Sequence, residues 1–101
     1  MKLLLITAIE EFEKNIKDIL IHSGVKTFSY SNVRGVKANG DSHSSENWFS
    51  AGLPESDSLM FTVFVDNNFV DLIYERIQKF NSKQEFQSKI HVASIAIEKS
   101  L

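Results

Sequence analysis

Short apolar runs and longer amphipathic stretches alternate along this chain, and their order predicts the fold. The runs LLLI and LMFTVFV are almost wholly apolar, and they predict buried strands over about residues 2–9 and 59–65. Residues 25–36 and 89–98 alternate apolar with polar side chains, which predicts two half-buried strands. The pattern therefore indicates four strands.

Two of the intervening segments have apolar residues at the spacing of a helix. The first stripe consists of Phe12, Ile16, Ile19 and Leu20, and the second of Phe69, Val70, Ile73, Ile77 and Phe80. Glu10 and Glu11 suit the N-terminus of the first helix, and Gly24 is expected to end it in the left-handed conformation. The second helix is expected to be capped by Asn67 or Asn68.

The predicted order of elements is β-α-β-β-α-β, which is the order of an α+β ferredoxin-like sandwich. This fold has an antiparallel four-stranded sheet with two helices on one face, and right-handed crossovers leave few other arrangements. A long polar insertion at about residues 37–57 separates the second and third strands. With 101 residues, the chain is expected to form one domain over residues 1–101.

The first and third strands are apolar on both faces, although an exposed face should alternate apolar with polar residues. Two helices can cover only one face of the sheet. The other face is therefore expected to be covered by further copies of the chain, in a closed homo-oligomer. We expect Phe61 and Val63, or Leu4 and Ile6, to face the other copies. Replacing either pair with Asp should therefore break the assembly.

Composition narrows the function classes. The net charge of −2, with acids and bases mixed along the chain, argues against nucleic-acid binding, which needs a basic face. Cysteine is absent, which excludes disulfides and thiolate metal sites. No apolar run is long enough for membrane insertion and the N-terminus lacks a signal-peptide pattern, so we expect a cytoplasmic protein. No Ser/His/Asp pattern indicates catalysis, and we do not expect an enzyme.

Three segments together resemble the PII signalling proteins. They are GVKTFSYSNVRGVK at residues 24–37, LMFTVFVDNNFVDLIYERI at 59–77 and SKIHVASIAIE at 88–98. The resemblance covers nearly the whole chain, with the segments in the same order and at similar spacing. The chain is similar to the shortened, divergent PII-like proteins. The resemblance implies a homotrimer with its sheets facing a central axis. It also implies that residues 37–57 form the T-loop, the arm that docks onto a target protein.

PII proteins bind nucleotides in clefts between subunits, at the base of the T-loop, and the bound effector changes the shape of that loop. By this resemblance, the candidate contacts for an anionic effector such as an adenine nucleotide are Arg34, Gly35, Lys37 and Lys89. Without the resemblance, the basic residues would be ordinary surface charges. The stretch NSKQEFQSK departs from the family pattern, because it lacks the Gly residues whose backbone amides approach phosphates.

Trp48 and Phe49 lie in the middle of the polar insertion, away from both helix stripes. Trp is enriched at interaction hot spots, so this pair is the predicted anchor for a regulated partner protein. Some PII-like groups are associated with transporters, which makes a membrane transporter one candidate partner. The alternative is that both aromatic side chains fold back onto a hydrophobic surface of the chain itself.

A different function follows from the CutA family, which shares the fold and the trimer, lacks a T-loop of this kind and is linked to divalent-metal tolerance. In this interpretation His43, with Asp41 and Glu46, binds a divalent metal, since imidazole and carboxylate groups suit Zn or Cu. Their spacing matches no known ligand pattern, and a polar loop with a surface His is the simpler interpretation. An adenine nucleotide and a divalent metal thus remain the two candidate ligands.

Overall fold

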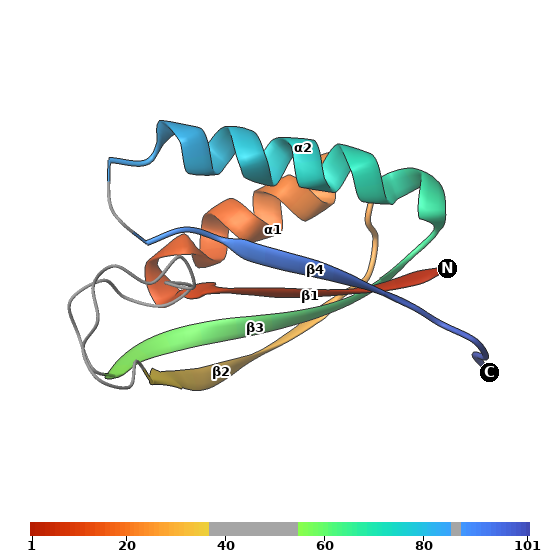
Figure 1. The fold of residues 1–101 in the computed structure, drawn as a ribbon, viewed down its shortest axis with the longest axis horizontal. Coiled ribbons are helices and arrows are strands. Elements are labelled where there is room, and N and C mark those ends of the chain that lie inside the picture. The colour runs from red at the N-terminus through yellow and green to blue at the C-terminus, as the bar shows by residue number, and fades with distance from the viewer. Residues whose placement is uncertain (37–54, 86–87) are drawn as a thin grey trace.

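The computed structural model describes residues 1–36, 55–85 and 88–101. Its elements follow the predicted order along the chain (Figure 1). They are β1 (Lys2–Ile9), the 3₁₀ turn η1 (Glu10–Phe12), α1 (Glu13–His22), β2 (Ser29–Val36), β3 (Glu55–Val65), α2 (Asn67–Lys83) and β4 (His91–Ala96). Among the described helices, none is both long enough and apolar enough to cross a membrane.

The four strands form one antiparallel sheet in the order β2-β3-β1-β4. The two apolar strands β1 and β3 occupy its centre, where Leu4 pairs with Val63 on one side and with Ser94 on the other. The edges of the sheet are β2 and β4. Figure 1 shows α1 and α2 over the same face of the sheet. This arrangement confirms the predicted ferredoxin-like α+β fold.

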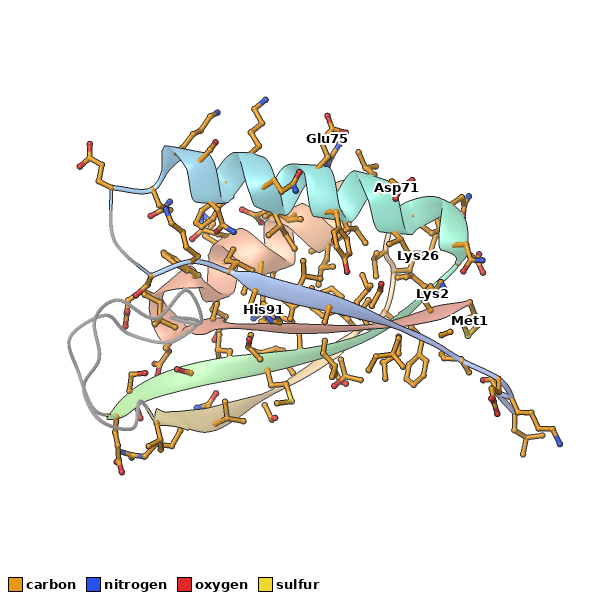
Figure 2. All side chains as sticks on the ribbon, in the orientation of Figure 1. Met1, Lys2, Lys26, Asp71, Glu75 and His91 are labelled. Carbon is orange, nitrogen blue, oxygen red and sulfur yellow. The ribbon has the colours of Figure 1, made fainter. Side chains whose placement is uncertain are left out.

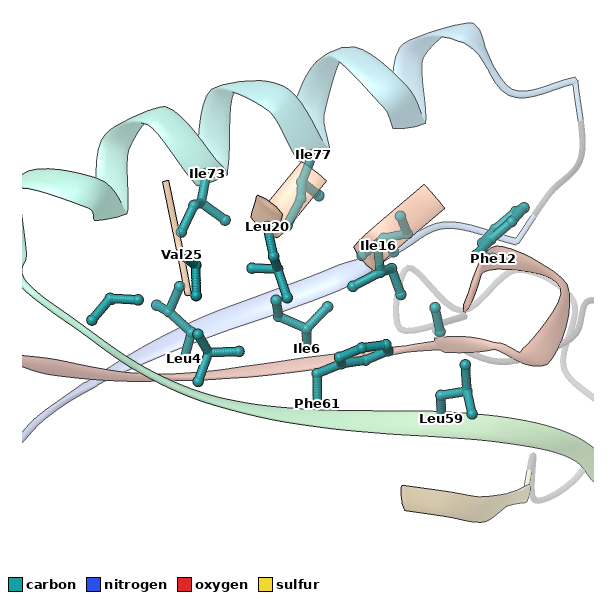
Figure 3. Packing of buried hydrophobic residues seen from close by; sticks show 14 of the residues in the cluster. Leu4, Ile6, Phe12, Ile16, Leu20, Val25, Leu59, Phe61, Ile73 and Ile77 are labelled. Atoms are coloured by element: carbon teal, nitrogen blue, oxygen red, sulfur yellow. The ribbon is translucent and has the colours of Figure 1, made fainter. Parts of the chain in front are cut away.

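The hydrophobic core lies between the helices and one face of the sheet (Figure 3). Four strand residues at its centre are each 0% exposed, namely Leu4, Ile6, Phe61 and Val63. The helix residues packed against them include Ile16, Leu20, Ile73 and Ile77. The expectation that these strand positions face another copy is therefore wrong. Their side chains pack against the helices of their own chain, so Asp there would disrupt folding before assembly.

The opposite side of the sheet, called the open face below, carries the alternate residues of the same strands. Leu3 of β1 pairs with Phe64 of β3 and with Ile95 of β4, which places the three side chains in one row. Phe64 is 57% exposed, Ile95 45% and Met60 36%. Neither helix covers this side (Figure 1). An apolar sheet face without a helix layer therefore exists as predicted, but with different residues on it.

Two strand boundaries differ from the predicted ones. β2 begins at Ser29 and not at residue 25, and before it Gly24 has a φ of 99°, as expected for a left-handed helix end. β3 begins at Glu55, because the hairpin continues far enough to pair Val36 with Glu55 and Arg34 with Asp57. Residues 55–57 therefore belong to a strand and not to the predicted T-loop.

The other two differences concern α2 and β4. The N-cap of α2 is Asp66, not Asn67 or Asn68, and its side chain makes no capping hydrogen bond. The last strand, His91–Ala96, lies inside the predicted range of residues 89–98. These shifts leave the order of the elements unchanged.

Candidate functional site

Arg34 and Lys89, two basic residues of the predicted ligand site, lie at opposite edges of the sheet. Arg34 is on β2, where it pairs with Asp57 of β3. Lys89 comes just before β4, whose first residue, His91, pairs with Thr7 of β1. Neighbouring strands are about 4.8 Å apart, so three strand spacings separate the edges by roughly 14 Å. One chain therefore does not bring these two cations together around a single small ligand.

Both cations nevertheless lie at the same end of the sheet. Ser58, which follows Asp57, pairs with Ile9 at the end of β1, so Arg34 is close to this end. β4 begins beside the same end, two residues after Lys89 (Figure 1). Residues 37–54 connect β2 and β3 there as well. The geometry therefore places the two predicted contacts at the end of the sheet where β2 ends and β3 begins.

Carboxylates surround Arg34. Its Nη1 lies 3.4 Å from Oε2 of Glu55 and its Nη2 lies 3.6 Å from Oδ1 of Asp57. The same groups line a surface hollow of about 370 Å³ that also includes Glu10 and Glu11. All three ion-pair side chains are more than half exposed, so each pair stabilises the fold by at most about 1 kcal/mol. Arg34 can therefore leave its partners at small cost, although the hollow as a whole is acidic.

Lys89 is bound to the C-terminal end of α2 through Asn81. The Lys89 ammonium donates to the backbone oxygen of Asn81 at 2.9 Å, where a cation is favourable at a helix C-terminus. The Asn81 amide donates to the Ile90 oxygen and accepts from the Ile90 nitrogen, both at 2.9 Å. Asn81 therefore fixes where the chain enters β4, and with it the position of Lys89. An ammonium has three donors, so Lys89 can still bind a further acceptor.

The remaining predicted site residues divide into two groups. Gly35 is buried within the hairpin, where it pairs with Ser56. The predictions for Lys37, His43, Glu46, Trp48 and Phe49 lie outside the described residues. Within residues 1–36, 55–85 and 88–101, no three His, Asp or Glu side chains come together in a way that could hold a metal ion.

Sequence reasoning missed both the acidic surroundings of Arg34 and the role of Asn81. Glu55 and Asp57 belonged to the predicted loop, and only the extended hairpin places them beside Arg34. Asn81 bonds to a residue beyond the end of its own helix, and no local pattern in the sequence signals such a contact. Both features depend on how segments distant in sequence pair.

No model of a known protein family and no curated protein matches the chain. Solved structures do match it. One is CPII, a nitrogen regulatory PII-like protein from Thiomonas intermedia K12, bound to ADP, AMP and bicarbonate. The TM-score is 0.65 at 18% identity, over 99% of this chain and 94% of that one. A second structure of CPII, bound to ADP and bicarbonate, gives 0.63 at 20% identity over 97% and 88%. This chain has the PII-like fold.

The PII-like fold confirms the fold that the sequence resemblance implied. In this chain it puts the hairpin of β2 and β3 at one edge of the sheet and β4 at the other. Arg34 lies near the end of β2, and Lys89 lies two residues before the start of β4. Within one chain, a ligand that contacts both residues would have to span the width of the sheet.

Proposed function

We propose that this chain is a PII-like regulatory protein that binds an adenine nucleotide between subunits and controls a partner protein through residues 37–54. The likeness of fold extends over 99% of the chain, and CPII, which shares it, is described as a nitrogen regulatory protein bound to ADP and AMP. The proposed role of this chain is binding and signalling, not catalysis. The observation that carries the location of the site is the placement of Arg34 and Lys89 on opposite edges of one sheet.

Self-assembly is the first part of this proposal. The open face presents Leu3, Met60, Phe64 and Ile95, of which the last three are more than a third exposed. The strand positions on this face include no Asp, Glu, Lys or Arg in the described part of the chain. Copies that meet through this surface therefore avoid like-charge repulsion while they bury apolar side chains. The resemblance to PII proteins supports a homotrimer as the form of this assembly.

The ligand site follows from the assembly. In a closed ring, the edge of one copy meets a different edge of its neighbour. An Arg34 edge beside a Lys89 edge places two cations around one anion, which offsets the acidic hollow near Arg34. Phosphate groups of a nucleotide supply such an anion. Each site then consists of residues from two copies.

Titration calorimetry with ADP, AMP and ATP tests the site. Arg34→Ala and Lys89→Ala should each weaken nucleotide binding by about ten- to a hundredfold, because a hydrogen bond to a charged group contributes roughly 1.5–3 kcal/mol. Lys26→Ala is the matched control, since Lys26 lies at the opposite end of the sheet (Figure 2). Equal affinity for all three variants would exclude Arg34 and Lys89 from the site.

Mixing the two site variants tests whether the site lies between subunits. When Arg34→Ala and Lys89→Ala chains are unfolded and refolded together, about one site in four should combine an intact Arg34 with an intact Lys89. Those sites should bind nucleotide with the affinity of the wild type. If each site lay within one chain, no intact site would form, and the mixture would bind as weakly as its components.

Residues 37–54 are the proposed docking arm, which binds the regulated partner protein. A membrane transporter is one candidate for this partner. Trp48 and Phe49 are the proposed apolar anchor of the arm. Deleting about a dozen residues around Trp48 should leave the assembly folded, because the free energy of loop closure depends weakly on loop length. If the assembly keeps its melting temperature and its trimeric state, these residues are not needed for folding, and loss of partner binding by the same variant would then support a docking arm. Unfolding would instead show that the aromatic side chains cover a surface of the chain itself.

A further inference from the structure

Arg34, the proposed phosphate contact, already has two anionic partners in its own hairpin. Its Nη1 lies 3.4 Å from Oε2 of Glu55, and its Nη2 lies 3.6 Å from Oδ1 of Asp57. Asp57 is the direct pairing partner of Arg34, and Glu55 lies two residues earlier on β3. Residues two apart in a strand point to the same side, so both acidic residues share the side of the sheet that Arg34 occupies. Each terminal nitrogen of the guanidinium is therefore next to a carboxylate.

These two ion pairs contribute little to the fold. The side chains of Arg34, Glu55 and Asp57 are 63%, 54% and 72% exposed. Water and salt screen pairs that are exposed to this degree, and their effect on stability is small. The hairpin is also held by the backbone pairing of β2 with β3 and by the buried side chains of β3. We therefore expect the larger effect of the two carboxylates on a ligand of Arg34.

A phosphate group bound to Arg34 would lie close to both carboxylates. A phosphate oxygen that accepts a hydrogen bond from Nη1 or Nη2 lies about 2.9 Å from that nitrogen, and thus within roughly 6 Å of the nearer carboxylate oxygen. Glu10 and Glu11 also line this hollow, so four carboxylates stand among its described lining residues. In the proposed site, Arg34 and the Lys89 of a second copy are the only two cations that oppose them among the described residues.

The acidic surroundings affect nucleotides unequally. Release of Arg34 from its two partners costs the same free energy whether AMP, ADP or ATP binds. Repulsion between phosphate and carboxylate groups instead grows with the negative charge of the nucleotide, which rises with each phosphate group. In a water-like medium, two like charges about 6 Å apart weaken binding roughly threefold. The carboxylates therefore disfavour ATP most and AMP least.

We infer that Glu55 and Asp57 are specificity residues of the nucleotide site: their carboxylates compete with phosphate for Arg34 and make the site favour AMP over ATP. This inference rests on the proposed function, because it takes the Arg34 site as the place where nucleotide binds. Two cations without these carboxylates would favour the most highly charged nucleotide instead. Salt should weaken the preference for AMP, because both carboxylates are exposed and screened.

Titration calorimetry in EDTA tests the inference, because each nucleotide keeps its full charge when no divalent cation is present. The wild type should bind AMP at least about tenfold more tightly than ATP, with ADP between them. Glu55→Gln and Asp57→Asn keep the shape of each side chain and remove one negative charge. Each should tighten ATP binding by about three- to tenfold and AMP binding by less, so that the ratio of the two affinities narrows.

Glu75→Gln is the matched control. Glu75 is exposed on α2 (Figure 2) and is not among the described residues that line the hollow. The variant removes one negative charge from the chain but none from the hollow, so it should bind each nucleotide as the wild type does. Circular dichroism should show the same fold for all three variants, because the charges that they remove are exposed. In about 0.5 M salt, the preference of the wild type for AMP should shrink.

The outcomes separate this inference from the proposed function. If no adenine nucleotide binds, or if Arg34→Ala binds each one as the wild type does, the proposed site is wrong and the inference fails with it. If nucleotides bind through Arg34 but the wild type prefers ATP, the site stands and the specificity role is overturned. An unchanged ratio of affinities in Glu55→Gln and Asp57→Asn overturns it as well. Weaker binding by these variants would do the same, because the carboxylates would then position Arg34 and not compete with the ligand.

Discussion

The two faces of the central strands are almost equally apolar in sequence, yet the structure treats them differently. On the helix side, Leu4, Ile6, Phe61 and Val63 are completely buried within one chain. On the open face, Phe64 keeps 57% of its surface exposed although it lies in the same strand as Phe61. Full burial of a side chain of this size contributes roughly 1.5–3 kcal/mol. The open face therefore holds stabilising free energy that a single chain does not use.

This difference separates folding from assembly. Residues on the helix side determine whether the chain folds, because their burial is complete before any second copy arrives. Residues on the open face contribute most of their hydrophobic free energy only when something covers them. Substitutions on the two faces should therefore have different consequences, even at neighbouring positions of one strand.

The largest effect is expected on the helix side. Phe61→Asp places a carboxylate in the hydrophobic core, at a position that is 0% exposed and where the Phe61 ring stacks on Tyr30 and contacts Phe28. The substitution should cost more than about 4 kcal/mol and leave the chain unfolded at room temperature. Circular dichroism and thermal melting measure this directly. A folded Phe61→Asp chain that has lost only its self-association would reverse the assignment of the two faces.

Phe64→Asp is the matched change on the open face. Its side chain is already 57% exposed in the single chain, so the chain should keep its fold as a monomer and lose only the stability that assembly adds. Self-association should weaken by on the order of tenfold to a hundredfold per copy, because an apolar contact of about 1.5–3 kcal/mol is lost. Sedimentation equilibrium measures the change. A variant that remains fully trimeric would show that the open face is not the contact between copies.

Asn81→Ala should weaken folding without touching the open face. The substitution removes both hydrogen bonds to Ile90, which is 3% exposed, and leaves its backbone nitrogen without this partner. We expect a loss of about 1–3 kcal/mol in the free energy of unfolding. Urea denaturation measures the loss, with Ser82→Ala as the neighbouring control at an exposed position. If the two variants were equally stable, the clamp at the end of α2 would contribute nothing.

The smallest effect is expected where the chain leaves α1. Gly24 has a φ of 99°, and a Cβ atom there would lie 3.0 Å from Cε1 of Phe69. Gly24→Ala should therefore cost about 1–2 kcal/mol through backbone strain and require Phe69 to shift. The exposed neighbour Thr27→Ala should change stability by less than about 0.5 kcal/mol. Both variants should assemble as the wild type does, since neither position belongs to the open face.

Several features of this protein could be predicted from local sequence alone. The apolar runs of β1 and β3, the two helix stripes and the left-handed glycine at the end of α1 each depend on residues close together in the chain. Their order then leaves few ways to fold, because crossovers are right-handed. The surplus of apolar residues in β1 and β3 also predicted a sheet with one face left to cover.

The sequence could not predict which face of β1 and β3 packs against the helices. A strand has a period of two, so the pattern shows that Leu4 and Ile6 share one side and Leu3 and Leu5 the other. When both sets are apolar, nothing local states which set meets the helices. The pairing of Thr7 with His91 likewise depends on the register between β1 and β4.

Sequence by itself thus determined the elements, their order and the presence of a surplus apolar surface, because these follow from composition within each segment. Tertiary structure alone decided that β3 reaches back to Glu55, that Arg34 lies among carboxylates and that Asn81 clamps the entry to β4. It also decided that Arg34 and Lys89 lie on opposite edges of the sheet. The physical reason is that each of these contacts joins residues whose pairing is set by the whole sheet and not by their neighbours in the chain.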